Sequence, residues 1–435
     1  MMRKIFAPFL IPLIVSASFL SSCTNTAKSS KSTIIIWHWM TDRQAAFEEL
    51  AKQYEAKTGI KINFELYAPS DAYSQKVRAA AQGNTLPDIY GLLSEKRDFS
   101  SFVKSGHVAD LTPFLEEDNG KWKKDFFAKA LAVNEFREDN SYGVKAGFYG
   151  VPIDVMTIQM LYNKKLFKKA GLPTDKPPAT WDDFMAAIEK LRAAGIQGLV
   201  SGWSEIWMID CFASNYAFNI MGEAKVLATI KGEVPYTDPD WIKVFDLFVQ
   251  MRDKNVLATG VITMVNKTAE QLFSNEKCAF AFNGSWCVNV YKGMNPDLDY
   301  GVMLPPQVSD KNPMMVWGGA ASSFLVNNRS ASKEQAVAFL KWLTSPKQQI
   351  YLAEATNNLP ANHNALKGIP PILAQFADAM EYTTHPNIWG VSEFPAVIET
   401  LDKGLQSIIL GEKTPQQLAA LVQKIKEREM ARAKK

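Results

Sequence analysis

The chain has 435 residues, of which 47% are apolar and 21% are charged, and its net charge at pH 7 is +3. This length suffices for two or three domains, and the composition is that of a soluble globular protein that buries a large core. Basic and acidic residues nearly balance and no basic patch stands out, which argues against nucleic acid as a partner.

The N-terminus has the pattern of an export signal. Arg3 and Lys4 form a short positive region, and the almost wholly apolar stretch 5–20 follows. This stretch is shorter than the roughly 20 residues that a membrane-spanning helix needs. We therefore expect a cleaved signal peptide rather than a transmembrane anchor.

A candidate lipid-attachment site ends this signal. The segment Leu20-Ser21-Ser22-Cys23 resembles the bacterial lipobox, whose cysteine receives acyl chains. The signal peptide would then span residues 1–22, and the Ser/Lys-rich stretch 23–32 would be a flexible lipidated tether. We expect the mature protein on the extracytoplasmic face of the cell membrane, anchored through Cys23.

Strand and helix patterns alternate at the start of the mature chain. The apolar run 34–37 is typical of a buried parallel strand, residues 60–65 alternate between apolar and polar, and 86–90 lead into a third strand. Helical patterns cover 47–54, where apolar residues fall on one face, and 71–82. This β-α-β-α-β order predicts a parallel sheet with helices on its faces.

Two further α/β stretches follow in the chain. The second begins near residue 147, contains the apolar run 158–162, and continues into an amphipathic helix over 181–191. The third returns to strand-like patterns at 300–304 and 323–326 before a mainly helical C-terminus. The sequence therefore predicts an α/β protein throughout its mature length.

No motif for catalysis or metal binding is present. Cys23, Cys211, Cys278 and Cys287 form no C-x-x-C or Cys/His cluster, and the four histidines lack metal-ligand spacing. There is no G-x-S-x-G, H-E-x-x-H, G-x-G-x-x-G or P-loop motif either. We expect a binding protein without metal or cofactor, and buried free thiols at Cys278 and Cys287, because a disulfide would need a turn that brings their Cα atoms within about 7 Å.

Several segments together resemble one family of binding proteins. In chain order they read IIIWHW (34–39), LPDI (86–89), LYNKKLF (161–167), TWDDF (180–184), FNGSW (282–286), WGG (317–319) and AFLKWLTS (338–345). Each is weak alone. In this order they span nearly all the mature chain and closely resemble the extracellular solute-binding proteins of the maltose-binding, family 1 type, in which lipoprotein versions are common.

The resemblance implies the two-lobed periplasmic-binding-protein fold of type II, with a hinge that closes the lobes on a ligand. It implies discontinuous lobes, the N-terminal one over 33–146 plus 304–355 and the C-terminal one over 147–303 plus 356–435. It also implies a carbohydrate ligand, mono- or oligosaccharide, and delivery to ABC permease subunits in the membrane. We expect a monomer without enzymatic activity.

A carbohydrate site needs aromatic rings for the C–H faces of the sugar and polar groups for its hydroxyls. Such groups collect at the carboxyl ends of strands in open α/β sheets. The family commonly stacks the ring at Trp286 on sugar, and the glycines after Trp317 would let a ligand approach the backbone. The candidate ligand-binding residues are Trp37, His38, Trp39, Glu95, Asp154, Trp203, Glu205, Trp207, Trp286, Trp317, Gly318, Gly319 and Trp389.

Each candidate has a structural alternative, and so does the function. The tryptophans could pack in the core, His38 could be an ordinary hydrogen-bonded residue, and Glu95 and Asp154 could be exposed charges. An exported lipoprotein glycosidase is the competing enzyme class, since glycosidases also lack short signatures. The ligand could also be another solute, such as glycerol phosphate, for which a Lys/Arg cluster is expected but not evident, or a polyamine.

Overall fold

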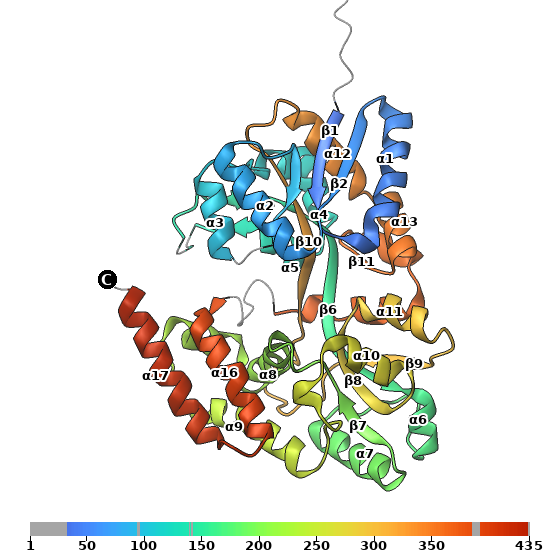
Figure 1. The fold of residues 1–435 in the computed structure, drawn as a ribbon, viewed down its shortest axis with the longest axis vertical. Coiled ribbons are helices and arrows are strands. Elements are labelled where there is room, and N and C mark those ends of the chain that lie inside the picture. The colour runs from blue at the N-terminus through green and yellow to red at the C-terminus, as the bar shows by residue number, and fades with distance from the viewer. Residues whose placement is uncertain (1–32, 94–95, 139, 141, 385–391, 434–435) are drawn as a thin grey trace, which may run out of the picture.

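The structure is a computed structural model that describes residues 33–93, 96–138, 140, 142–384 and 392–433. It has two α/β lobes that share one nine-stranded sheet, one lobe above the other in Figure 1. The predicted two-lobed α/β fold is confirmed. The predicted signal peptide, the tether and Cys23 lie outside the described residues.

The N-terminal lobe is built on three parallel strands, because β1 (Thr33–His38) pairs in parallel with both β2 (Lys61–Leu66) and β3 (Ile89–Gly91). The apolar face predicted within 47–54 is buried against this sheet as part of α1. The remaining elements of the lobe are α1 (Gln44–Thr58), α2 (Ser70–Gly83), α3 (Lys96–Lys104), α4 (Thr112–Lys124), α5 (Ala128–Leu131), β4 (Glu135–Phe136), β5 (Gly147–Phe148), α12 (Lys333–Leu343), α13 (Pro346–Thr356) and the 3-10 helices η1 (Thr41–Arg43), η2 (Ala132–Asn134) and η4 (His363–Gly368).

The C-terminal lobe continues the sheet with β7 (Gln197–Val200), β8 (Cys278–Gly284) and β9 (Tyr300–Met303). Some of its helices begin at a side-chain cap, as at Thr180, whose side chain accepts from the Asp183 N–H. Its helices are α6 (Lys164–Lys169), α7 (Trp181–Ala193), α8 (Trp207–Lys231), α9 (Pro239–Asp253), α10 (Asn266–Ser274), α11 (Cys287–Met294), α14 (Pro371–Ala377), α16 (Pro395–Ile409), α17 (Pro415–Ala433), η3 (Val261–Thr263) and η5 (Met380–Tyr382).

Two long antiparallel strands, β6 (Val151–Asn163) and β10 (Trp317–Val326), run from one lobe into the other (Figure 1). The segment that contains β11 (Leu359–Pro360) pairs with β6 beside them. The lobes are therefore joined by strands of one sheet, and a small change of twist in these strands could rotate one lobe against the other.

The chain changes lobe later than the boundary predicted at residue 304. The Gln307 N–H donates to the Ala179 carbonyl (2.8 Å), and Asn219 Nδ2 donates to the Asn312 carbonyl (2.8 Å), so both segments lie on the C-terminal lobe. The predicted boundary at 355 is also early, because the His363 N–H donates to the Asp125 carbonyl in the N-terminal lobe (3.0 Å). These loops carry no periodic pattern that would reveal which lobe they contact.

Strand direction brings the carboxyl ends of both halves of the sheet to the same gap. β3 is antiparallel to β10 and β8 is antiparallel to β6, while β6 and β10 are antiparallel to each other. The strands of the two lobes therefore point toward one another across the hinge. Ligand-binding groups of open α/β sheets occur at such strand ends.

The three described cysteines, Cys211, Cys278 and Cys287, are free and buried, which confirms the prediction of free thiols. They belong to cores that fill both lobes. Among the described residues, no helix has the length and apolarity needed to cross a membrane.

Two carboxylates are buried close together where α8 packs on α16. Burial raises the pKa of both Asp210 and Asp402, and the Asp210 charge raises the pKa of Asp402 further. At this pair the folded protein binds more protons than the unfolded chain above about pH 4, so the contribution of the pair to the free energy of unfolding falls as the pH rises.

Asp402→Asn should remove this penalty and raise the free energy of unfolding at pH 8 by about 1–3 kcal/mol, since one pKa unit corresponds to about 1.4 kcal/mol. Near pH 4 the variant and the parent should be equally stable. Guanidinium unfolding at both pH values measures this, with Asp253→Asn as control, since that carboxylate lies in a half-exposed surface pair. Equal gains at pH 4 and pH 8 would show that the pair does not titrate in this range.

Candidate functional site

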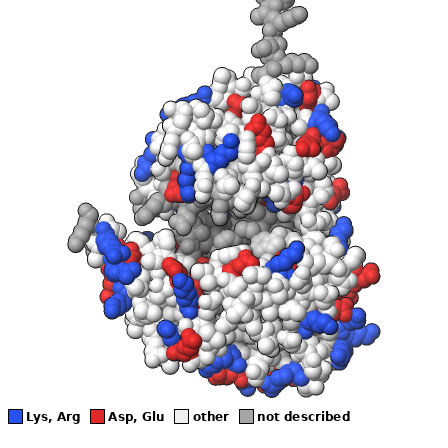
Figure 2. Space-filling model, viewed as in Figure 1, with Lys and Arg blue, Asp and Glu red and all other residues white. Residues whose placement is uncertain are grey.

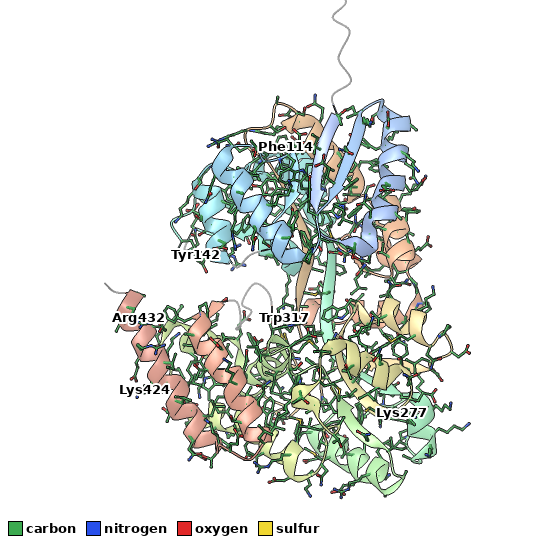
Figure 3. All side chains as sticks on the ribbon, in the orientation of Figure 1. Phe114, Tyr142, Lys277, Trp317, Lys424 and Arg432 are labelled. Atoms are coloured by element: carbon green, nitrogen blue, oxygen red, sulfur yellow. The ribbon has the colours of Figure 1, made fainter. Side chains whose placement is uncertain are left out.

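A cavity of about 460 Å³ lies against the N-terminal lobe at the gap between the lobes. Figure 2 shows the surface hollowed between the two lobes. Four aromatic residues line the cavity, namely Trp39, Phe99, Phe136 and Tyr142, and Tyr142 is labelled at the edge of the gap in Figure 3. Ser392, just before α16, brings the C-terminal lobe to the same cavity.

The Trp39 ring is held in a fixed position at the end of the sheet by its packing. The ring lies over Gly91, where a Cβ would come within 2.3 Å of the Trp39 Cζ3 atom. Tyr73 supports this position, because its ring packs on Trp39 with centroids 5.2 Å apart and its hydroxyl donates to the Gly91 carbonyl (2.7 Å). The ring is thereby held half-buried at the carboxyl ends of β1 and β3, with part of it open to the cavity.

The floor of the cavity is polar and comes from the hinge strand β10. Register shifts on either side of Ser322 interrupt its pairing with β6. Ala320, Ala321, Ser322 and Ser323 line the cavity there with small side chains, so their backbone is within reach of a ligand. Arg43 Nη1 donates to Ser322 Oγ (2.9 Å), and Asn134 Nδ2 donates to Ser323 Oγ (2.9 Å), which orients both hydroxyls.

Asp154 and His38 are both buried in the protein and do not line the cavity. Asp154 forms an ion pair with Arg43 (2.5 Å), and burial raises its pKa to about 6 although the guanidinium opposes this. His38 is completely buried between Phe47 and Phe64, where burial lowers its pKa to about 4 and leaves it neutral at pH 7. The prediction that Asp154 and His38 contact the ligand is therefore wrong, because both are buried in the protein.

Trp37 lies within the N-terminal lobe, away from the cavity. Its indole N–H donates to Glu65 Oε2 (2.9 Å), and the Lys76 ammonium lies 4.3 Å from its ring centroid. Tyr67 packs edge-on against the same ring at 5.3 Å. These contacts satisfy the indole internally, so Trp37 supports the end of β1 rather than lining the cavity.

Two tryptophans form an aromatic pair at the strand ends of the C-terminal lobe. Trp207 is 40% exposed, and its ring centroid lies 6.0 Å from that of Trp286. The Trp286 ring lies over Gly284, where a Cβ would approach it to 1.9 Å. Its hydrogen bond with Glu270 occupies the indole N–H, so only the ring is available to a ligand.

Trp203 and Glu205 hold the loop between β7 and α8 in place. Trp203 is completely buried, with its ring edge-on to Phe212 at 5.5 Å, which corrects its assignment to a ligand site. Glu205 Oε1 accepts from the Asn266 N–H at the start of α10 (2.7 Å). These contacts position Trp207, which follows in the chain.

Trp317 is half-buried at the start of β10, and it lies on the upper side of the C-terminal lobe facing the gap in Figure 3. The two glycines after it are buried in the hinge instead of open to a ligand. A Cβ at Gly318 would come within 2.6 Å of the Met156 carbonyl oxygen, so Gly318 serves the close packing of β10 on β6. This corrects the prediction for Gly318 and Gly319. Glu95 and Trp389 lie outside the described residues.

A second cavity of about 730 Å³ continues from the first and shares Ala132, Glu135 and Arg137 with it. It extends along α4 and α5 and reaches Glu223 on α8 of the opposite lobe. The space between the lobes is thus elongated. Each cavity is within the size range of small-molecule sites.

These features define a class of protein. Two α/β lobes share hinge strands, and a cavity lined by aromatic and hydroxyl groups lies where their strand ends meet, which is the architecture of a solute-binding protein. The family described as bacterial extracellular solute-binding protein matches residues 37–350. The chain belongs to this family, which confirms the resemblance found in its sequence motifs.

Individual relatives are distant but cover most of the chain. A multiple sugar-binding protein of Streptococcus mutans is 23% identical over 78% of this chain and 78% of its own length. The melibiose/raffinose/stachyose-binding protein MelE of Bacillus subtilis is 22% identical over 84% of this chain and 82% of its own. Among solved structures, a chitin oligosaccharide binding protein superposes with a TM-score of 0.71 at 21% identity and covers 92% of this chain and 98% of that one.

Proposed function

We propose that this chain is the substrate-binding lipoprotein of an ABC importer and that it captures a carbohydrate between its lobes. The observation that carries the proposal is the pairing of an aromatic ring, Trp39 packed over Gly91, with the oriented hydroxyl of Ser323 on the cavity floor. A sugar presents an apolar C–H face to the ring and hydroxyls to the floor. The names of the two sequence relatives support the same ligand class.

Lobe closure would complete the site. Trp207 and Trp286 form a ring pair in the C-terminal lobe, and Trp317 lies at the side of the gap that this lobe forms (Figure 3). A ligand that contacts both lobes favours the closed state, because it shifts the equilibrium by its differential affinity. The closed complex would then be delivered to the permease subunits, with the protein held at the membrane through acyl chains on Cys23.

Binding rather than hydrolysis fits the chemistry of the first cavity. Glycoside hydrolysis needs two carboxyl groups on either side of the scissile bond. Among the described residues that line this cavity, Glu135 is the one carboxylate, and it lies 3.4 Å from Arg137 Nε. Trp39, the serines and the asparagines can hold a sugar, but they offer no acid and base pair.

A thermal-shift screen of the mature protein against mono- and oligosaccharides tests the proposal. A bound sugar at 100 times its Kd should stabilise the protein by about 2.7 kcal/mol. Trp39→Ala should weaken the binding of that sugar by about 1–3 kcal/mol, the range found when other aromatic stacking residues are removed. The matched control is Trp342→Ala, since Trp342 is also half-buried but packs on Tyr54 away from the cavity. An unchanged sugar affinity in Trp39→Ala would show that the sugar does not bind in this cavity.

A further inference from the structure

A lysine lies among the aromatic residues of the first cavity. Lys96, at the start of α3, is half-buried and lines the cavity with Trp39, Phe99 and Phe136. Its ammonium nitrogen is 4.1 Å from the centroid of the Phe136 ring and 5.3 Å from that of Phe99. A neutral sugar requires no cation at this place, so the position of Lys96 bears on the chemistry of the ligand.

Neutral groups hold the Lys96 ammonium in place. It donates to the carbonyls of Val133 (2.7 Å) and Glu135 (2.6 Å). An ammonium has three N–H donors, so two carbonyl bonds fix its position and leave a third donor for a ligand. The carbonyls do not neutralise its charge.

The described lining of this cavity carries an excess of positive charge. Its charged side chains are Lys96, Arg137 and Glu135, and the Glu135 carboxylate already pairs with Arg137. Burial lowers the pKa of Lys96 to about 8, even though the Glu135 charge opposes this. Among the described residues no carboxylate forms an ion pair with Lys96, so an anion from the ligand would supply a countercharge to this partly desolvated ammonium.

We infer that the cleft selects a carbohydrate that bears a carboxylate, such as one with a uronic acid residue, and that Lys96 binds this carboxylate while Trp39 stacks on the ring. The inference rests on the proposed function and specifies its ligand. A carboxylate on a sugar reaches the ammonium through a charge-assisted hydrogen bond, which is stronger than a bond between neutral groups. Lys96 is thus a specificity-determining residue.

Calorimetric titration with matched sugars tests this inference. Two pairs of ligands are compared: trigalacturonic acid with galactotriose, and xylotriose that carries a glucuronic acid branch with plain xylotriose. A sulfated galactotriose is a further ligand, which distinguishes recognition of a carboxylate from recognition of any anion. The parent should bind one of the acids at least tenfold tighter than its neutral partner and the sulfated sugar no tighter than the neutral one. Lys96→Met should remove that preference and leave the neutral sugar within about twofold, while Lys96→Arg should keep it.

Lys104→Met is the matched control. Lys104 ends the same helix and also donates to a carbonyl, that of Tyr142 (3.0 Å), but it is exposed and does not line the cavity. Its replacement should leave both affinities unchanged. Because Lys96→Met could disturb the fold, the parent is also titrated at rising salt, where the affinity for the acid should fall and that for the neutral sugar should hold.

Three results would overturn the inference. The first is equal binding of acidic and neutral partners by the parent. The second is an equal loss of affinity for both in Lys96→Met, which would make Lys96 a structural residue. The third is a higher affinity for the sulfated sugar than for the neutral one. That result would show that the site recognises sulfate and would contradict the stated ligand class. Failure of the proposed function looks different, since no sugar of either kind would then bind.

Discussion

Lys426→Met should lower the free energy of unfolding by about 3–5 kcal/mol, the range for breaking a buried ion pair. The Lys426 ammonium lies 2.6 Å and 2.7 Å from the two carboxylate oxygens of Glu393, and both side chains are almost completely buried. Tyr236 donates its hydroxyl to the same carboxylate (2.8 Å). Without the lysine, Glu393 remains as a buried charge with no cation.

Guanidinium unfolding of the variant and of Lys424→Met measures this loss. Lys424 is on the same helix, α17, and is exposed; Figure 3 labels it. Its replacement should change stability by less than about 0.5 kcal/mol, as for other surface sites. A loss below 1 kcal/mol for Lys426→Met, on the order of a surface pair, would show that water reaches the pair. The pair also anchors the chain next to Ser392, so it supports the C-terminal edge of the cavity.

Arg43→Met should destabilise the protein by about 3 kcal/mol at pH 8, the low end for a buried pair because Asp154 can take up a proton. Arg43 joins the loop after β1 to both hinge strands, through Asp154 on β6 and Ser322 on β10. The loss should therefore also reduce sugar affinity, since Ser322 belongs to the cavity floor.

The pH dependence of this loss identifies its cause. The pKa of Asp154 is about 6 in the parent, and removal of the cation raises it further. At pH 5 the carboxyl is neutral in both proteins, so the variant should lose stability relative to the parent only as the pH rises through about 6. The double variant Arg43→Met/Asp154→Asn should recover most of the loss at pH 8. Arg78→Met, which breaks a surface pair with Asp98, should cost at most about 1 kcal/mol.

Hydrophobic period predicted most of the fold. The helices expected over 181–191 and 47–54 are α7 and α1, and their apolar faces are buried. The alternation of side chains in β1 and just after it also separates the buried residues from the two tryptophans. Ile34, Ile36 and His38 share one face and are all buried, so Trp37 and Trp39 must point to the other face.

The polar floor could be predicted only in part. The run of small residues after Trp317 indicates close approach of the backbone, but its bulge depends on pairing with β6. Arg43 and Ser322 are 279 positions apart in the chain, and no local pattern couples them. Trp203 and Trp207 differ in burial because the loop folds back on α10, a contact that sequence spacing does not reveal.

Calorimetric titration of the mature protein with the best sugar of the screen, followed by chromatography of that sugar, tests the central claim most directly. We expect a saturable heat at one sugar per chain, recovery of the sugar intact, and a lower affinity in Trp39→Ala with the fold preserved. The claim would be contradicted if no acidic or neutral sugar of the panel gave a binding heat, or if the sugar were cleaved in the calorimeter cell.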